Sequence, residues 1–221
     1  MAQQAPNRIV VELLHHTPIA VCAHAIRTCW QSFAKGDGGG EVDCSLIERV
    51  GNEYRHSSTL EHLVYSFYIR GISRACLQEL ARHRIASLSV KSTRYTLKEL
   101  RKEASFLPCE EGENQRRAER FIVFTGDARV DCASIAALEN LRALLCDGVS
   151  NDVAKFAMPE CYRTELTWTI NARSLQNFLQ LRSHKRALWE ICNLAHALFG
   201  AIPKEHQFIF AHHIDLGDSQ E

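Results

Sequence analysis

Residues 62–84 constrain the fold more than any other part of this chain, because their side-chain pattern changes from that of a strand to that of a helix. His62 to Ile72 alternates in polarity and is rich in β-branched and aromatic residues, which predicts a strand. Ser73 then offers a hydroxyl that can cap a helix, and the last turn of this helix delivers the basic residues 82–84. The chain therefore mixes strands with helices.

Caps and helical periodicity predict the neighbouring elements. Thr17 and Pro18 form a cap and first-turn pair that opens a helix through about Trp30. Residues 127–146 are typical of a strong amphipathic helix, whose expected buried face holds Val130, Ile135, Leu138, Leu141 and Leu145. The other expected elements are a turn over Gly36–Gly40, a short helix over Cys44–Tyr54, a loop between two modules over Lys98–Arg120, an extended segment over Glu165–Asn171, a helix over Ala172–Arg182 capped by Asn171, and a helix over Lys185–Phe199.

Length and composition limit the class of protein. With 221 residues the chain can bury a real core, and we predict a single domain over residues 1–221. No apolar run reaches the ~18 residues that span a membrane, and residues 1–8 lack the pattern of a signal peptide. Nine cysteines without a Cys-x-x-Cys pair indicate reduced thiols and a cytoplasmic protein. A net charge of +0 argues against a nucleic-acid coat, so neither a nucleic acid nor a membrane is an expected partner.

The segment from Leu80 to Lys98 holds five Lys or Arg residues and no acid, although the whole chain has 26 basic and 26 acidic residues. Arg fits phosphate through a planar fork, and Ser and Thr hydroxyls donate to the same oxygens. We therefore expect this segment to bind a phosphorylated ligand. A helix dipole alone would account for residues 82–84, but it would leave Lys91, Ser92 and Arg94 unexplained.

A second basic segment runs from Leu166 to Arg186, again without acids. Asn171, Arg173 and Asn177 lie near one predicted helix start, where backbone N–H groups and the helix dipole favour an anion. Two acid-free basic segments are what two clustered phosphorylated ligands would require.

A third segment, residues 56–62, precedes the predicted strand and contains His56, Ser58, Glu61 and His62. Two His residues with a Glu between them could suggest a metal site. Their spacing is not that of a pair on one face of a helix, so we expect no metal. From the residues alone, a seryl cap on a turn with a solvated Glu61 remains an equal alternative.

Arg82-His83-Arg84, then seven residues, then Ser92 with Arg94 two positions later, resembles the motif of the flavin-dependent thymidylate synthases. The other two segments match the same family, and the resemblance runs from about Ala25 to Glu190. It implies an α+β fold, with helices packed on a mostly antiparallel sheet. It also implies a methyltransferase that uses FAD and NADPH, takes one carbon from 5,10-methylenetetrahydrofolate and converts dUMP to dTMP. Family members are homotetramers whose active sites draw residues from several subunits.

The resemblance also implies the roles of individual residues. Those assigned to dUMP are Glu79, Arg82, Lys91, Ser92, Thr93, Arg94, Lys155 and Arg182. Those assigned to FAD are Ser58, Glu61, Arg82, His83, Arg84, Val90, Asn171, Arg173 and Asn177, and His56 is expected over the flavin and the folate. Arg182 is the expected catalytic residue, because a permanent cation near the uracil ring favours its ionised form and raises electron density at C5.

Two candidate nucleophiles are rejected. Ser92 has no His or carboxylate near it in sequence to act as a base, so its hydroxyl is expected to bind phosphate. Pro108-Cys109 faintly resembles the nucleophile of the flavin-independent thymidylate synthases. Three glutamates follow Cys109 within four residues, and their negative charge disfavours a thiolate.

The chain departs from the family pattern at several positions. Glu79 stands where Gln is common, and Ser89-Val90 replaces an Asn-Glu pair whose carboxylate often contacts flavin and nucleotide. Lys155, Arg186 and Cys29 stand where an Arg, a His and a Ser are common. A flavin- or nucleotide-binding regulator without turnover is therefore one alternative. An RNA-binding module that uses the same cations on backbone phosphates is another.

Overall fold

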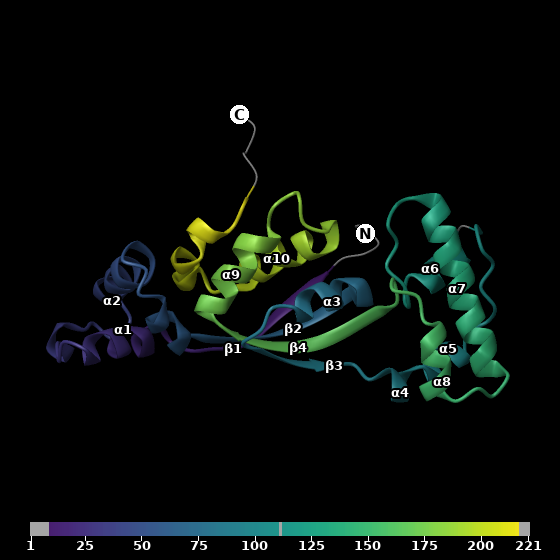
Figure 1. The fold of residues 1–221 in the computed structure, drawn as a ribbon, viewed down its shortest axis with the longest axis horizontal. Coiled ribbons are helices and arrows are strands. Elements are labelled where there is room, and N and C mark those ends of the chain that lie inside the picture. Colours follow the sequence, from purple (N-terminus) through teal and green to yellow (C-terminus); the bar gives the residue numbers. More distant parts are fainter. Residues whose placement is uncertain (1–8, 111, 217–221) are drawn as a thin grey trace. The chain divides into compact units, whose positions relative to one another are not determined.

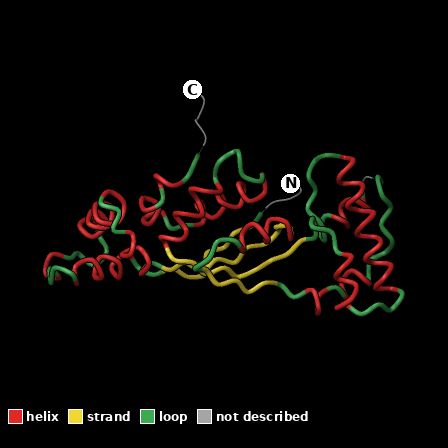
Figure 2. The backbone as a smooth tube through the Cα atoms, viewed as in Figure 1, coloured by secondary structure: helices red, strands yellow, loops and turns green. Residues whose placement is uncertain are grey.

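A four-stranded sheet organises the computed structural model, which describes residues 9–110 and 112–216. The strands are β1 (Val10–His16), β2 (Val64–Ser73), β3 (Ala86–Val90) and β4 (Arg163–Asn171), in the order β1-β2-β4-β3 (Figures 1 and 2). Backbone hydrogen bonds join Thr17 to Val64 at 2.9 Å, Ala172 to Leu63 at 2.8 Å and Lys91 to Glu165 at 2.9 Å. Each of these bonds joins the end of one strand to the start of its neighbour, so the sheet is antiparallel. The predicted α+β class, with helices on an antiparallel sheet, is confirmed.

The described chain divides into two compact units. The sheet unit comprises residues 10–69, 79–89 and 167–216, and the helical unit comprises residues 70–78 and 90–166 together with Ile9. Strands β2 and β4 each contribute residues to both units. A single domain over residues 1–221 stays a prediction.

Two helices cover one face of the sheet in the sheet unit. α9 (Ala172–Arg182) and α10 (Trp189–Ala201) lie side by side there (Figure 1). The alternation predicted for β2 is real, since Tyr65, Phe67 and Ile69 are fully buried. The other helical segments that lie wholly within this unit are α1 (Ile19–Thr28), η1 (Phe33–Lys35), α2 (Glu41–Ile47), the π-helix η2 (Glu48–Glu53), η3 (Ser57–His62), η5 (Lys204–Ile209) and η6 (Ala211–His213).

The helical unit has its own apolar core, which the sequence prediction missed. Residues 98–120 are not simply a loop, because α5 (Lys98–Arg101) and α6 (Glu113–Ala118) form there and Leu100 and Phe106 are buried. These side chains pack against α7 (Ala128–Cys146), whose buried residues are Ile135, Leu138, Leu141 and Leu145. The expected burial of Val130 is wrong, since this side chain is 47% exposed. α4 (Thr93–Thr96), α8 (Asn151–Ala154) and η4 (Lys155–Ala157) complete the unit.

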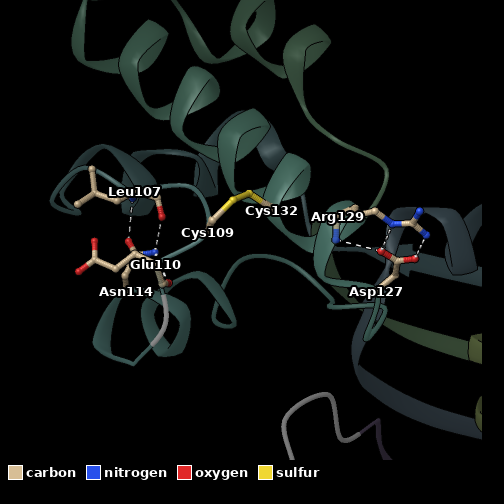
Figure 3. Close-up of a disulfide and its surroundings, with 7 residues drawn as sticks. All are labelled: Leu107, Cys109, Glu110, Asn114, Asp127, Arg129 and Cys132. Atoms are coloured by element: carbon tan, nitrogen blue, oxygen red, sulfur yellow. Dashed lines mark hydrogen bonds and ion pairs between the residues drawn. A yellow bond between two sulfur atoms is a disulfide. The ribbon is translucent and has the colours of Figure 1, made fainter.

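A disulfide joins Cys109 to Cys132 in the helical unit and attaches the segment before α6 to α7 (Figure 3). The side chain of Asn114 folds the same segment, accepting from the N–H of Leu107 at 3.0 Å and donating to its carbonyl at 2.8 Å. The expectation that all cysteines are reduced is therefore wrong at these two positions. The bond also leaves Cys109 without a thiol that could act as a nucleophile.

Capping predictions give mixed outcomes. Ser73 Oγ accepts from the Cys76 N–H at 3.0 Å at the start of α3 (Arg74–Ala81), as predicted. Pro18, and not Thr17, occupies the cap of α1, because the Thr17 hydroxyl bonds to Val64 at the start of β2 instead.

Other element boundaries also differ from the expectations. The expected helix over residues 44–54 starts earlier, at Glu41, and continues as a π-helix, whereas the last long helix starts later, at Trp189. Residues 1–8, whose composition argued against a signal peptide, lie outside the described residues. No helix within residues 9–110 and 112–216 is long and apolar enough to cross a membrane.

Candidate functional site

A basic cavity of about 640 Å³ lies in the sheet unit. Its size falls within the range of roughly 300–1,000 Å³ that is usual for small-molecule sites. The side chains that line it are Glu61, Arg82, His83, Arg84, Ile85, Arg173, Ser174, Asn177, Leu181 and Arg182. All of them except Ile85, Ser174 and Leu181 are residues that the resemblance assigns to flavin or nucleotide. The structure therefore brings together predicted residues from three separate segments.

The end of α3 presents the basic motif to this cavity. The His83 N–H donates to the Leu80 carbonyl at 3.1 Å and closes the last turn, after which the chain enters β3. Ile85 makes this change of direction with φ at 63°, in the left-handed region that β-branched residues rarely adopt. Its side chain is 77% exposed and forms part of the cavity wall. The strained turn thus sets the direction of the residues on either side of it.

One face of α9 forms another wall. Arg173, Asn177 and Leu181 recur every four residues and so lie on the same side of the helix. Asn171 does not line the cavity but caps the helix, its Oδ1 accepting from the Ser174 N–H at 2.9 Å. The helix start and its neighbouring cations make this wall suitable for an anion.

Arg182, at the end of α9, is held by two acceptors. Its Nε donates to His83 Nε2 at 2.9 Å, and its Nη1 pairs with Glu79 Oε2 at 2.8 Å. The other oxygen of Glu79 lies 3.7 Å from Arg82 Nη1. Burial, and then the charge of Arg182, lower the pKa of His83 from 6.5 to about 4. His83 is therefore neutral near pH 7 and can act as an acceptor.

The fold supplies acids that the basic segments lack. Besides Glu79, Glu61 pairs with Arg173 at 2.7 Å across the cavity wall. The lack of acids within the two basic segments therefore does not leave their cations without an anion from the protein. Arg84 is the exception in this cavity, since it forms no ion pair with any residue in the described part of the chain.

The predicted phosphate-binding residues around Ser92 belong to the helical unit. Ser92 occupies the cap position of α4, and Lys91 and Thr93 line a small cavity of about 50 Å³. Arg94 donates to both oxygens of Asp152, at 2.8 and 3.0 Å, and Lys91 pairs with Glu165 at 3.1 Å.

Two further predicted residues of the helical unit are Lys155 and Val90. Lys155 in η4 lies with its ammonium 5.8 Å from the ring centre of Phe156. Val90, at the end of β3, is 38% exposed. Neither residue lines the basic cavity, which belongs to the sheet unit.

A second cavity of about 720 Å³ in the sheet unit contains His56. Aromatic and basic side chains share its walls, among them Trp30, Arg49 and Tyr54. Trp30 is 84% exposed and Tyr54 61% exposed. Ser58 is exposed on η3 and lines neither of the two larger cavities. Nowhere in the described chain do three or more His, Cys, Asp or Glu side chains gather in a way that could hold a metal ion.

Sequence reasoning missed several of these residues. Leu181 carried a usable signal, because it is an apolar residue on the polar face of an amphipathic helix and is 57% exposed. Ile85 carried a similar signal, because it is a large apolar residue directly after the basic residues 82–84. Asp152 carried no such signal, since it lies 58 residues from Arg94 in the chain.

Comparison with known proteins gives consistent matches. Residues 12–206 match the family model described as thymidylate synthase complementing protein. The flavin-dependent thymidylate synthase of Wolinella succinogenes is 65% identical over 202 residues, which cover 91% of this chain and 97% of that protein. The Helicobacter pylori enzyme of the same name is 59% identical over 197 residues, covering 89% and 94%. A crystal structure of thymidylate synthase X from Helicobacter pylori with FAD and dUMP superposes with a TM-score of 0.89 at 56% identity, covering 94% of this chain and all of that chain.

Proposed function

Because the chain belongs to the family of flavin-dependent thymidylate synthases, we propose that it methylates dUMP reductively to dTMP, with FAD as its cofactor. The observation that carries the proposal is the basic cavity, where seven residues of the family motifs from η3, the α3–β3 turn and α9 converge. The relative from Helicobacter pylori, which holds FAD and dUMP, supports the same ligands here.

The cavity residues fit FAD in charge and in shape. Arg82, Arg84 and Arg173 offer guanidinium donors to a pyrophosphate. The exposed side chains of Ile85 and Leu181 offer apolar surface to a flat ring system. When bound and reduced by NADPH, the flavin would supply the hydride that reduces the transferred carbon.

Arg182 is the residue that we assign to activation of the uracil ring. A guanidinium cannot lose its charge under these conditions, so it stabilises a developing anion without transferring a proton. Its side chain is 18% exposed, which limits screening by water. Glu79 and Arg82 complete the proposed ring-facing group.

The phosphate of dUMP is assigned to Ser92, Thr93 and Arg94, with Lys91 close by and with Lys155 as a further contact. Arg94 is paired with Asp152, but both side chains are more than half exposed. An exposed pair of this kind contributes only about 0–1 kcal/mol. A phosphate that accepts from Arg94 bidentately can therefore replace Asp152 at little cost.

The one-carbon donor is proposed to be 5,10-methylenetetrahydrofolate, and NADPH the source of reducing equivalents. Folates join an aromatic system to a carboxylate tail. The second cavity, with Trp30, Tyr54 and Arg49 beside His56, offers surfaces of both kinds.

A homotetramer with shared active sites is part of the proposal. Large apolar side chains are exposed in both units, including Phe156 at 86% and Trp30 at 84%, and such side chains are common at protein interfaces. Light scattering of the purified protein would give the mass directly. The cytoplasmic location predicted from the sequence stays a prediction.

The test is an assay of dTMP formation by protein reconstituted with FAD. We expect dTMP only when NADPH, dUMP and methylenetetrahydrofolate are all present, with NADPH consumed in step. Bound FAD and dUMP without dTMP would favour the regulator instead. Absence of flavin binding would overturn the proposal.

Variants of Arg182 test its assigned role. Arg182→Ala should keep FAD but lose about 10- to 100-fold or more in kcat, from the loss of charge-assisted hydrogen bonds. Arg186→Ala is the matched control, because Arg186 is an exposed arginine just after α9 that lines neither cavity. Unchanged turnover in Arg182→Ala would refute the role.

A further inference from the structure

We propose that His83 is a positioning residue that holds Arg182 for the reaction, a role that the motif does not suggest. The neutral imidazole accepts a hydrogen bond from Arg182 Nε and fixes the plane of the guanidinium without reducing its charge. This inference rests on the proposed function.

The contacts of Arg182 leave part of its guanidinium available. Nε donates to His83 at 2.9 Å, and Nη1 pairs with Glu79 at 2.8 Å. Nη2 donates no hydrogen bond to any of the described residues. Two acceptors of fixed position therefore determine the orientation of the group, and the remaining N–H donors can meet a ligand in the cavity that Arg182 lines.

The His83 ring is itself held firmly. It is only 7% exposed and packs edge-on against Phe178, with ring centres 4.9 Å apart. Phe178 in turn packs against the buried Trp168 of β4 at 5.2 Å. Phe178 lies one turn before Arg182 on α9, so the His83 ring contacts two side chains of the same helix.

Charge explains why a histidine suits this place. The charged groups that face His83 are Arg182, Glu79 and Arg82, and burial combined with the Arg182 charge keeps the pKa of His83 near 4. A carboxylate in its position would cancel the Arg182 charge, which Glu79 already offsets in part. A protonated ring would offer no acceptor at Nε2 and would repel the guanidinium. A neutral acceptor orients Arg182 and leaves its field at the cavity intact.

Kinetics of two His83 variants separate positioning from flavin binding. His83→Phe keeps a ring against Phe178 but offers no acceptor, and His83→Gln offers an amide oxygen in its place. We expect His83→Phe to lower kcat by about 10- to 100-fold, the effect of one hydrogen bond to a charged group. The KM for dUMP and the Kd for FAD should each change by less than about threefold. His83→Gln should regain a substantial part of kcat.

Two outcomes would overturn the proposal while the wild-type enzyme still makes dTMP. One is a loss of FAD affinity as large as the loss of kcat, which would make His83 a flavin contact. The other is full turnover by His83→Phe. If the wild-type protein makes no dTMP, the proposed function fails first, so the two failures are distinguishable.

A measurement on the protein without ligands keeps the proposal testable if the His83→Phe variant fails to fold. Acceptance at Nε2 requires that the proton of the neutral ring sits on Nδ1. Side-chain ¹⁵N spectra of the histidines should show one Nδ1–H tautomer that disappears in His83→Gln. A His83 signal from the Nε2–H tautomer would exclude the hydrogen bond from Arg182, and with it the positioning role.

Discussion

Acid should destabilise this protein through His206, a histidine buried away from the proposed site. Its side chain is 1% exposed, and its Nδ1 lies 2.7 Å from the Tyr65 hydroxyl. The ring centre of His16 lies 4.8 Å from that of His206, edge to face. Burial, followed by the neighbouring His16, lowers the pKa of His206 from 6.5 to about 4, although the charge of Glu205 acts in the opposite direction. The folded state therefore holds His206 neutral where an unfolded chain would protonate it.

The sign of the effect follows from proton binding. Between pH 6.5 and about 4 the unfolded state binds more protons at this residue, so stability is present above pH 6.5 and is lost as the pH falls. A shift of this size corresponds to about 3 kcal/mol in total at ~1.4 kcal/mol per pH unit, and about 2 kcal/mol of it should be lost by pH 5. His83 has a pKa lowered to the same value and should contribute a similar loss.

The assay is denaturant unfolding followed by circular dichroism at several pH values between 7.5 and 5, at fixed protein and FAD concentrations. His206→Gln retains an acceptor for Tyr65 but cannot be protonated in this range. We expect it to be less stable at pH 7.5, and to lose about 2 kcal/mol less than the wild type by pH 5. His15→Gln, a substitution at an exposed position of β1, is the matched control. An unchanged pH dependence in His206→Gln would refute the reasoning.

Three further substitutions test other parts of the fold by the same unfolding assay. Asn171→Ala removes the cap of α9 and should cost about 1 kcal/mol, whereas Asn171→Asp should not. Arg27→Met leaves Asp43 buried without its 2.6 Å partner and should cost about 3–5 kcal/mol, part of which should return on adding Asp43→Leu. Leu138→Ala should cost about 2–5 kcal/mol because the side chain is fully buried. Leu144→Ala, at a half-exposed position of the same helix, should cost less than about 1 kcal/mol.

The elements that are stabilised by contacts between neighbouring residues could be predicted from the sequence. Ser73 and Asn171 cap the helices that they were expected to cap, because the bonds concerned join residues three apart. Strand β2 followed from its alternation, since one face of a half-buried strand must be apolar. Thr17 was misassigned because its hydroxyl bonds to Val64, 47 residues away, and no local pattern shows that contact.

The helical unit shows where composition misleads. Residues 98–120 are dense in charge, which suggested a loop, yet Leu100, Phe106 and Ala118 are buried among longer helices. Their few apolar residues are spaced irregularly, so no period could reveal a core that only α7 completes. The disulfide to Cys132 was also invisible, because pairing among nine cysteines depends on the fold.

The cations of the candidate site were predictable from the sequence, whereas the ion pairs that they form were not. The resemblance to the family grouped Arg82, Arg84 and Arg173, and the structure places all three around one cavity. Glu61 and Asp152 meet their arginines across 112 and 58 residues of sequence. A segment free of acids is therefore not a segment free of anions, because the fold decides which side chains become neighbours.

Because of Ile85, screening variants of this protein for thermal stability alone should select against ligand binding. A β-branched residue in the left-handed region costs about 1–3 kcal/mol, and glycine at this position would relieve that strain. Glycine would also remove a side chain that is 77% exposed on the cavity wall. Libraries screened only for a higher melting temperature should therefore enrich Ile85→Gly while ligand affinity falls. Turnover has to be scored alongside melting from the first round, or the improved clones will be the ones that have stopped working.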